Sequence, residues 1–217
     1  MGVPVTASPL TLSKARPIRQ AATMTVRTLF PTQLYEATLA DEALVADLDA
    51  SVRALAEEDM AGRRWSKEHG YRGYTSYASL NDLPLRDPVF ADLKRVLDRH
   101  VAKFAAACGM ELGGRKLKLD SLWVNLLKPG GGHSGHLHPH SVVSGTVYVA
   151  VPEGAGGIRF EDPRLPMLMA APTRPGTFET VAPQPGTLLL WESWLRHEVM
   201  PHAGKGERIS VSFNYRW

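Results

Sequence analysis

The second half of the chain, from residue 117 to the C-terminus, has the pattern of many short strands with no helical periodicity between them. The segment 117–129 alternates apolar and polar side chains, 141–152 is rich in β-branched residues, and the later segments are separated by Pro and Gly. The Gly-rich stretch 130–135 is predicted to be a loop. Consecutive strands without crossover helices pair antiparallel, and a run of about seven or eight of them closes most naturally as a jelly roll.

Helical periodicity is confined to the first half. Apolar residues recur three and four positions apart after Asp41, which is a suitable N-cap, and a second helix is predicted to begin at Asp87-Pro88 and to end at Gly109. We expect a strand within 25–39 and an irregular segment with at most one short strand over 59–86. Helices followed by strands predict an α+β fold, mainly β, in which helices within 41–108 pack on a β core of residues 115–217.

The chain of 217 residues fits a single domain, which we place at 25–217. The first 24 residues are rich in Pro and Ser and have no periodicity. They also lack the apolar region of a secretory signal. We expect them to be a flexible tail, or to precede the working start at Met24.

Charge and composition argue against several classes of protein. The basic residues before Glu36, which include Lys14 and Arg27, account for the net charge of +3, and the rest of the chain carries about −1. No basic face with interleaved aromatic residues is apparent, so we do not expect nucleic-acid binding. No apolar run approaches the ~20 residues that span a bilayer, so no membrane segment is expected. The single cysteine, Cys108, rules out an intramolecular disulfide and is compatible with the cytoplasmic location that we expect.

Three histidines alternate in the stretch GHLHPH, at His136, His138 and His140. In an extended strand they would share one face. Imidazole is a ligand for Fe, Zn, Cu and Ni, so a metal site is favoured over a polar loop that is merely rich in histidine. His197 follows an apolar strand and is expected to be a further ligand.

Arg208 and Ser210 lie near the start of the last predicted strand, two residues apart and therefore on one face. A guanidinium group binds a carboxylate through two parallel hydrogen bonds, and a serine hydroxyl adds a third donor. The pair is suited to holding the carboxylate of a ligand. A solvated charge or an internal ion pair is the simpler alternative for an isolated arginine.

This order of residues resembles that of the iron(II)/2-oxoglutarate-dependent oxygenases, whose pattern is H-x-D/E, a distal His, and an Arg or Lys about ten residues further on. The resemblance covers residues 117–217 well and 25–116 more weakly. It is carried by HLHPHSVVSGTVYV, GGIRFEDPR, GTLLLWESWLRHEV and ERISVSFN. It implies a double-stranded β-helix that uses Fe(II) and 2-oxoglutarate. By position, His136 and His197 would bind iron, and Arg208 with Ser210 would hold the far carboxylate of 2-oxoglutarate.

The chain departs from the family pattern at the second ligand, where His138 replaces the usual carboxylate. His138 can ligate directly and complete a three-histidine site. Alternatively it can turn away and leave a position for water or an anion, or a carboxylate such as Glu161 or Asp162 can complete the site. We favour direct ligation, because H-x-H spacing places both rings on one face of a strand.

Several further residues are candidates for the walls of the site. Some members of the family use an Asn on the preceding strand to contact 2-oxoglutarate, and Asn125 has that position here, although it can equally be a polar residue facing solvent. Trp123 is expected in the core or pocket wall, and His133 and His140 near the pocket. Four other aromatic residues are expected in the core or the pocket lining, namely Tyr148, Phe160, Trp191 and Trp194.

The resemblance thus implies an Fe(II)- and 2-oxoglutarate-dependent oxygenase, most simply a hydroxylase, that we expect to act on a small molecule or a peptide. Residues 65–84 are expected to form one wall of its substrate pocket. One alternative is a cupin-like three-histidine metal enzyme without 2-oxoglutarate, which would have no need of Arg208. Another is a non-enzymatic jelly-roll binding module whose partner contacts the helices. The sequence leaves the oligomeric state open, a homo-oligomer included.

Overall fold

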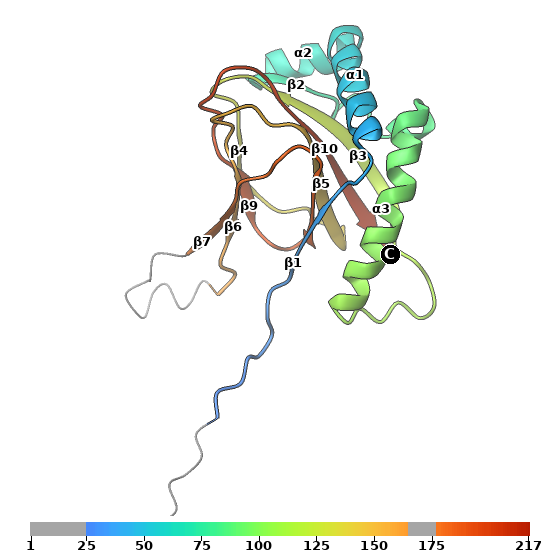
Figure 1. Ribbon diagram of the computed structural model, residues 1–217, viewed down its shortest axis with the longest axis vertical. Coiled ribbons are helices and arrows are strands. Elements are labelled where there is room, and N and C mark those ends of the chain that lie inside the picture. Colours follow the sequence, from blue (N-terminus) through green and yellow to red (C-terminus); the bar gives the residue numbers. More distant parts are fainter. Residues whose placement is uncertain (1–24, 165–176) are drawn as a thin grey trace, which may run out of the picture. The chain divides into compact units, whose positions relative to one another are not determined.

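The computed structural model describes residues 25–164 and 177–217 (Figure 1). The predictions made for residues 1–24 lie outside the described part. The described residues 25–32 belong to a unit separate from Gln33–Trp217 and contain no helix or strand. The strand expected within 25–39 is present but short, and it spans Leu34–Thr38 (β1).

The second half is a succession of antiparallel strands, as predicted. In chain order they are β3 (Lys118–Leu127), β4 (His133–His136), β5 (Val143–Ala150), β6 (Ile158–Glu161), β7 (Phe178–Val181), β8 (Thr187–Glu192), β9 (His197–Val199) and β10 (Arg208–Arg216). With β1 and the short β2 (Gly73–Thr75) they form two sheets. The larger has the order β1-β8-β5-β10-β3-β2 and the smaller has the order β4-β9-β6-β7. This is a mainly-β architecture of the jelly-roll type.

Strand β4 lies earlier in the chain than the strand expected to carry His136 and His138. It begins inside the Gly-rich stretch 130–135 that the sequence indicated as a loop, and it pairs with β9 through His133 opposite Val199 and His136 opposite His197. The glycines that suggested a loop are compatible with this strand because neighbouring backbone comes close to it. A side chain at Gly132 would lie 2.7 Å from the carbonyl oxygen of Val199.

The two faces of the large sheet have different characters, and this difference creates the site. On β10, Ile209, Val211 and Phe213 point into a core that they share with the helices. The alternate residues Arg208 and Ser210 point to the opposite face, toward the cavity described below. The apolar set of this strand therefore serves the core while the polar set lines a cavity.

Helices α1 (Glu42–Glu58) and α3 (Pro88–Ala107) begin where the sequence predicted. Asp41 caps α1 by accepting a hydrogen bond from the Leu44 amide at 3.0 Å. Asp87 caps α3 in the same way through the Val89 amide. The buried faces of both helices belong to the same hydrophobic core as the large sheet. No helix in residues 25–164 or 177–217 is long and apolar enough to cross a membrane.

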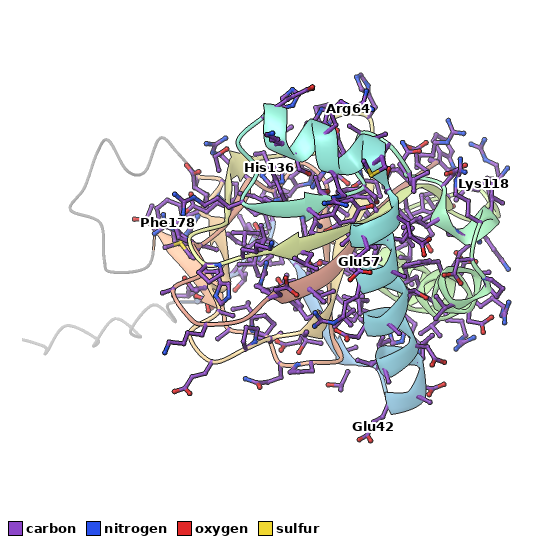
Figure 2. All side chains as sticks on the ribbon, turned by 90° about the horizontal axis from the view of Figure 1, so that it is seen from above. Glu42, Glu57, Arg64, Lys118, His136 and Phe178 are labelled. Atoms are coloured by element: carbon purple, nitrogen blue, oxygen red, sulfur yellow. The ribbon has the colours of Figure 1, made fainter. Side chains whose placement is uncertain are left out.

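Helix α2 (Met60–Glu68) corrects the prediction that 59–86 is irregular; a one-turn 3-10 helix follows at Leu83–Leu85. Its sequence, MAGRRWSKE, contains a glycine and lacks an apolar stripe, so periodicity gave no signal. The helix is fixed by its N-terminal cap instead. Asp59 accepts hydrogen bonds from the Gly62 amide and from the hydroxyls of Tyr74 and Ser79. Arg64 on α2 and Glu42 on α1 project outward (Figure 2).

Candidate metal centre

Three histidines converge at the small sheet. His136 ends β4 and His197 begins β9, and the two residues are direct partners in the antiparallel pair, with ring centroids 4.4 Å apart. His138 lies two residues beyond β4, where its amide donates to the Ser193 carbonyl at 3.0 Å. Its ring centroid is 5.2 Å from each of the others. One nitrogen of each ring lies within 4.8 Å of the other two, which is suitable for binding one metal ion.

Backbone carbonyls orient two of the three rings. Nδ1 of His136 lies 2.7 Å from the Ser134 carbonyl oxygen, and Nδ1 of His197 lies 2.9 Å from that of Leu195. A carbonyl oxygen can only accept, so Nδ1 carries the proton in both rings. Nε2 is then left with a lone pair, which is the arrangement typical of metal-ligating histidines.

Burial keeps two of the three rings neutral. It lowers the pKa of His197 to about 3 and that of His138 to about 4, and repulsion between neighbouring imidazoles lowers both further. Both imidazoles are therefore neutral at physiological pH. A neutral imidazole is the form that binds a metal ion.

No carboxylate joins the cluster among the residues that the structure describes. Glu161 and Asp162, the two alternatives from the sequence, are engaged elsewhere. A Glu161 oxygen lies 2.9 Å from Arg196 Nε, and an Asp162 oxygen lies 2.7 Å from an Arg164 guanidinium nitrogen. His138 therefore lies at the position where the H-x-D/E pattern has a carboxylate.

The histidines open into a cavity of about 550 Å³ between the two sheets. This volume is typical of pockets for small molecules. One wall comes from the segment 65–84, as expected, through Trp65, Tyr71, Thr75 and Tyr77. The large sheet contributes a polar wall that includes Asn125, Arg208, Ser210, Ser212 and Asn214.

Arg208 is the most unusual residue of this cavity. It is only 2% exposed, its Nε has no hydrogen-bond partner, and it forms no ion pair with any described Asp or Glu. Its guanidinium carbon lies 4.9 Å from the ring centroid of Tyr148. Burial of an unpaired charge costs several kcal/mol. The arginine is therefore suited to an anionic group that enters the cavity.

Asn125 belongs to a network that the sequence did not indicate. Its amide oxygen accepts from the Thr75 hydroxyl at 2.9 Å and from the Tyr71 hydroxyl at 3.2 Å, while its amide nitrogen donates to Ser212 at 3.1 Å. The Tyr71 oxygen also lies 2.8 Å from Nε2 of His133. Since that hydroxyl donates to Asn125, it accepts from the His133 ring. Tyr71 lies in the segment without periodicity, so no sequence signal could have placed it here.

Two expectations about the walls are wrong. His140 is exposed and has a positive φ of 68°, because β4 has already ended and the chain turns at Pro139-His140. Trp194 is 49% exposed and does not line the cavity, because it lies in the turn between β8 and β9. In contrast, His133, Trp123, Tyr148 and Trp191 line the cavity, and Phe160 is buried beside Trp191.

Comparison with known proteins agrees with this geometry. Residues 121–214 match a family model described as "Putative 2OG-Fe(II) oxygenase". The β core therefore resembles the 2OG-Fe(II) oxygenases. This is a family of oxidoreductases that use Fe(II) and 2-oxoglutarate, and the match covers β3 through nearly all of β10. No curated protein sequence matches the chain.

Solved structures share the fold of this chain at low sequence identity. A prolyl-4-hydroxylase from Pseudomonas putida is 20% identical with a TM-score of 0.61, and the match covers 86% of this chain and 94% of that one. HygX from Streptomyces hygroscopicus, with nickel, 2-oxoglutarate and hygromycin B bound, is 16% identical with a TM-score of 0.57, over 85% and 83% of the two chains. The α-ketoglutarate-dependent epimerase SnoN from nogalamycin biosynthesis is 20% identical with a TM-score of 0.56, over 85% and 76%.

Proposed function

We propose that the protein is an Fe(II)- and 2-oxoglutarate-dependent oxygenase that hydroxylates its substrate, with iron held by His136, His138 and His197. Three observations support this ligand set. The three rings meet within 4.8 Å, burial keeps His138 and His197 neutral, and backbone carbonyls fix Nδ1 of His136 and His197 as donors. Imidazole nitrogen is a good ligand for iron.

The observation that carries the assignment of 2-oxoglutarate is the unpaired Arg208. Its buried guanidinium lines the same cavity as the histidines, and Ser210 lies beside it on the same face of β10. In the proposed complex the far carboxylate of 2-oxoglutarate accepts hydrogen bonds from both residues. Asn125, paired with Ser210 across β3 and β10, is placed along the same wall, and its bonds to Thr75, Tyr71 and Ser212 hold its amide in one orientation.

Bound together, Fe(II) and 2-oxoglutarate activate dioxygen for the oxidation of a C–H bond. The residues of this chain bind and orient. Three neutral imidazoles leave the metal with one unit more positive charge than two histidines and a carboxylate would. Trp191 contributes an apolar wall beside His197, with ring centroids 4.6 Å apart. That wall excludes water from one side of the ligand set.

The main alternative is a three-histidine metal enzyme that does not use 2-oxoglutarate, and the replacement of a carboxylate by His138 favours it. Arg208 argues against it, because such an enzyme leaves the buried guanidinium without a partner. A site that binds metal only for structure is less compatible still. The histidines open into a cavity of about 550 Å³, whereas structural metal sites are closed by four protein ligands.

The substrate class that we propose is a small molecule or a peptide. The structural neighbours do not narrow it, since one is a prolyl-4-hydroxylase, one binds hygromycin B, and one is an epimerase. The cavity wall contributed by Trp65, Tyr77 and Trp123 is aromatic, with the rings of Tyr77 and Trp123 5.3 Å apart. It is suited to a substrate with an apolar or ring-shaped portion.

An anaerobic titration tests this proposal. Fe(II) is added to the metal-free protein, 2-oxoglutarate follows, and the visible absorption that arises when a 2-oxo acid chelates Fe(II) is recorded. The wild type and the control His140→Ala, which alters an exposed histidine outside the cavity, are expected to develop the band at one equivalent of iron. His138→Ala is expected to bind iron and develop the band more weakly. An unchanged band in His138→Ala would remove that residue from the ligand set.

A further inference from the structure

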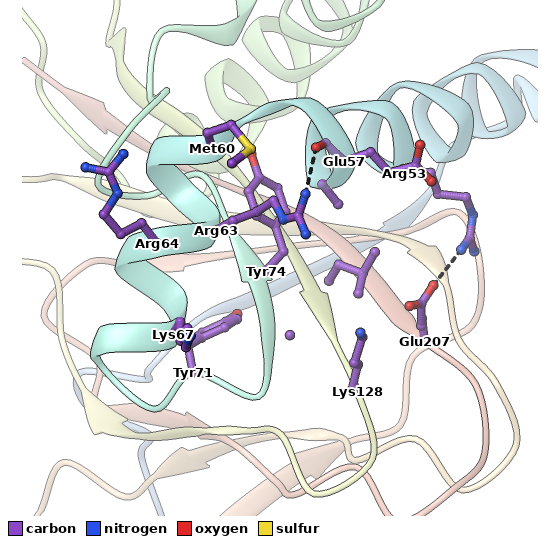
Figure 3. Close-up of a pocket in the computed structure, with 13 residues that line it drawn as sticks. Arg53, Glu57, Met60, Arg63, Arg64, Lys67, Tyr71, Tyr74, Lys128 and Glu207 are labelled. Atoms are coloured by element: carbon purple, nitrogen blue, oxygen red, sulfur yellow. Dashed lines mark hydrogen bonds and ion pairs between the residues drawn. The ribbon is translucent and has the colours of Figure 1, made fainter.

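A second cavity lies on the helix side of β2 and β3. It has a volume of about 890 Å³ and is bounded by α1, α2, the ends of β2 and β3, and the residue before β10 (Figure 3). We call it the basic groove. Its charged lining consists of Arg53, Glu57, Arg63, Arg64, Lys67, Lys128 and Glu207.

The basic groove holds an excess of positive charge. Five of its residues are basic and two are acidic, and Arg53 is neutralised by Glu207 at 2.7 Å. Arg63 donates to a backbone carbonyl, that of Glu57, at 3.1 Å. Among the described residues, Arg64, Lys67 and Lys128 form no ion pair.

This concentration is not a consequence of a basic protein. The whole chain has 25 Lys and Arg, and three of them lie before Met24, so residues 25–217 hold 22 basic and 22 acidic side chains. The groove is therefore a local positive region on a neutral body. Such a region attracts an anionic partner and increases its rate of association.

The floor of the basic groove is apolar. Ala56, Leu126 and Tyr74 lie beneath the charged side chains, and Met60 stands at the edge with 64% of its surface exposed. Methionine adapts its shape to varied apolar side chains. No exposed aromatic ring is available for base stacking, because Tyr74 is only 4% exposed and the Tyr71 hydroxyl is bonded to Asn125 on the inner side. Stacking platforms are typical of single-stranded nucleic-acid sites, so the floor favours a polypeptide.

We propose that the basic groove binds an acidic segment of a polypeptide partner, with carboxylates on Arg64, Lys67 and Lys128 and an apolar side chain on the exposed Met60. This site is distinct from the metal cavity, although the two are neighbours, since Tyr71 lines both. The inference does not depend on the oxygenase activity, because it rests on charge and shape alone.

The test uses a fluorescein-labelled peptide of six glutamates as the probe, titrated with the full-length, metal-free protein and followed by fluorescence anisotropy. The wild type is expected to bind the probe, and binding is expected to weaken with salt because exposed charges are screened over about 8 Å at physiological ionic strength. Arg64→Glu/Lys67→Glu is expected to bind roughly tenfold or more weakly. Lys103→Glu, which reverses an exposed charge on α3 outside the groove, is expected to bind as the wild type does.

A second variant controls for the possibility that the double substitution unfolds α2. Lys128→Glu reverses a charge on the opposite wall, just beyond β3. It is expected to weaken binding of the probe severalfold and to leave the circular dichroism spectrum unchanged. The proposal is overturned if the wild type does not bind the probe, or if the groove variants bind it as tightly as Lys103→Glu does. Equal or tighter binding of a hexathymidylate of similar charge would also overturn it, since the groove would then be a general polyanion surface.

Discussion

The substitution Arg208→Met separates ligand binding from folding. Methionine retains an unbranched side chain in the space of Arg208 but removes the guanidinium group. In the proposed complex that group donates two charge-assisted hydrogen bonds to 2-oxoglutarate, each of which contributes about 1.5–3 kcal/mol. The loss of both is expected to raise the Kd for 2-oxoglutarate by roughly 10²- to 10⁴-fold.

The same substitution is expected to leave the ligand-free protein as stable as the wild type, or more stable. Arg208 is 2% exposed, and its Nε has no partner. The folded state therefore carries a desolvation cost that no ion pair with a described residue offsets, and an apolar replacement removes that cost. Most substitutions of a fully buried residue destabilise, by about 1 kcal/mol or more, so this expectation is distinctive.

Calorimetric titration of 2-oxoglutarate into the Mn(II)-loaded protein measures the first effect, and urea unfolding of the metal-free protein measures the second. Arg159→Met is the matched control. Arg159 pairs with Glu198 on the small sheet and does not line the cavity, so its replacement should leave the affinity for 2-oxoglutarate unchanged. The reasoning is refuted if Arg208→Met binds 2-oxoglutarate within threefold of the wild type, or if it lowers the free energy of unfolding by more than about 2 kcal/mol.

Three further predictions concern the histidines and their surroundings. His197→Ala is expected to weaken Mn(II) binding at least about 100-fold in equilibrium dialysis, whereas equal retention of metal would contradict its role as a ligand. Folding holds the pKa of His138 at about 4 and that of His197 at about 3, below the ordinary value near 6.5. The unfolded state therefore binds more protons than the folded state at pH values between the folded and the ordinary pKa. The urea midpoint of the metal-free protein should therefore fall as the pH drops from about 6.5 toward 4, and a flat profile would argue against buried neutral rings. Tyr71→Phe removes the hydroxyl that bridges His133 and Asn125, and should lower the free energy of unfolding by about 1–3 kcal/mol in urea titrations; no change would mean that the bridge is not formed in solution.

The strands and the two long helices could be predicted because their sequences carry strong periodic signals. The alternation over 117–129 became β3, and the spacing after Asp41 became α1. Periodicity failed where tertiary contacts decide the structure. Helix α2 depends on a cap whose acceptor, Asp59, is bonded to side chains of a later segment, and β4 forms from a Gly-rich stretch because β9 lies beside it.

The histidine cluster was predicted for a reason that proved incomplete. Alternation on one strand was expected to align His136 and His138, but β4 ends at His136. His138 reaches the cluster because its backbone amide is held by Ser193, and His140 is turned away. The absence of an ionic partner for Arg208 among the described residues, and the bridge through Tyr71, depend on side chains from distant segments, so the sequence alone could not reveal them.

The most direct test of the proposed function is succinate formation from 2-oxoglutarate. The protein is loaded anaerobically with Fe(II) and 2-oxoglutarate and then exposed to oxygen, beside Arg208→Met and His197→Ala. Slow formation of succinate that requires iron, and that is lost in both variants, is the predicted result. If no succinate forms and 2-oxoglutarate does not bind, while the wild type still holds metal through its histidines, the cosubstrate assignment is contradicted and the chain is a three-histidine metalloprotein of another kind.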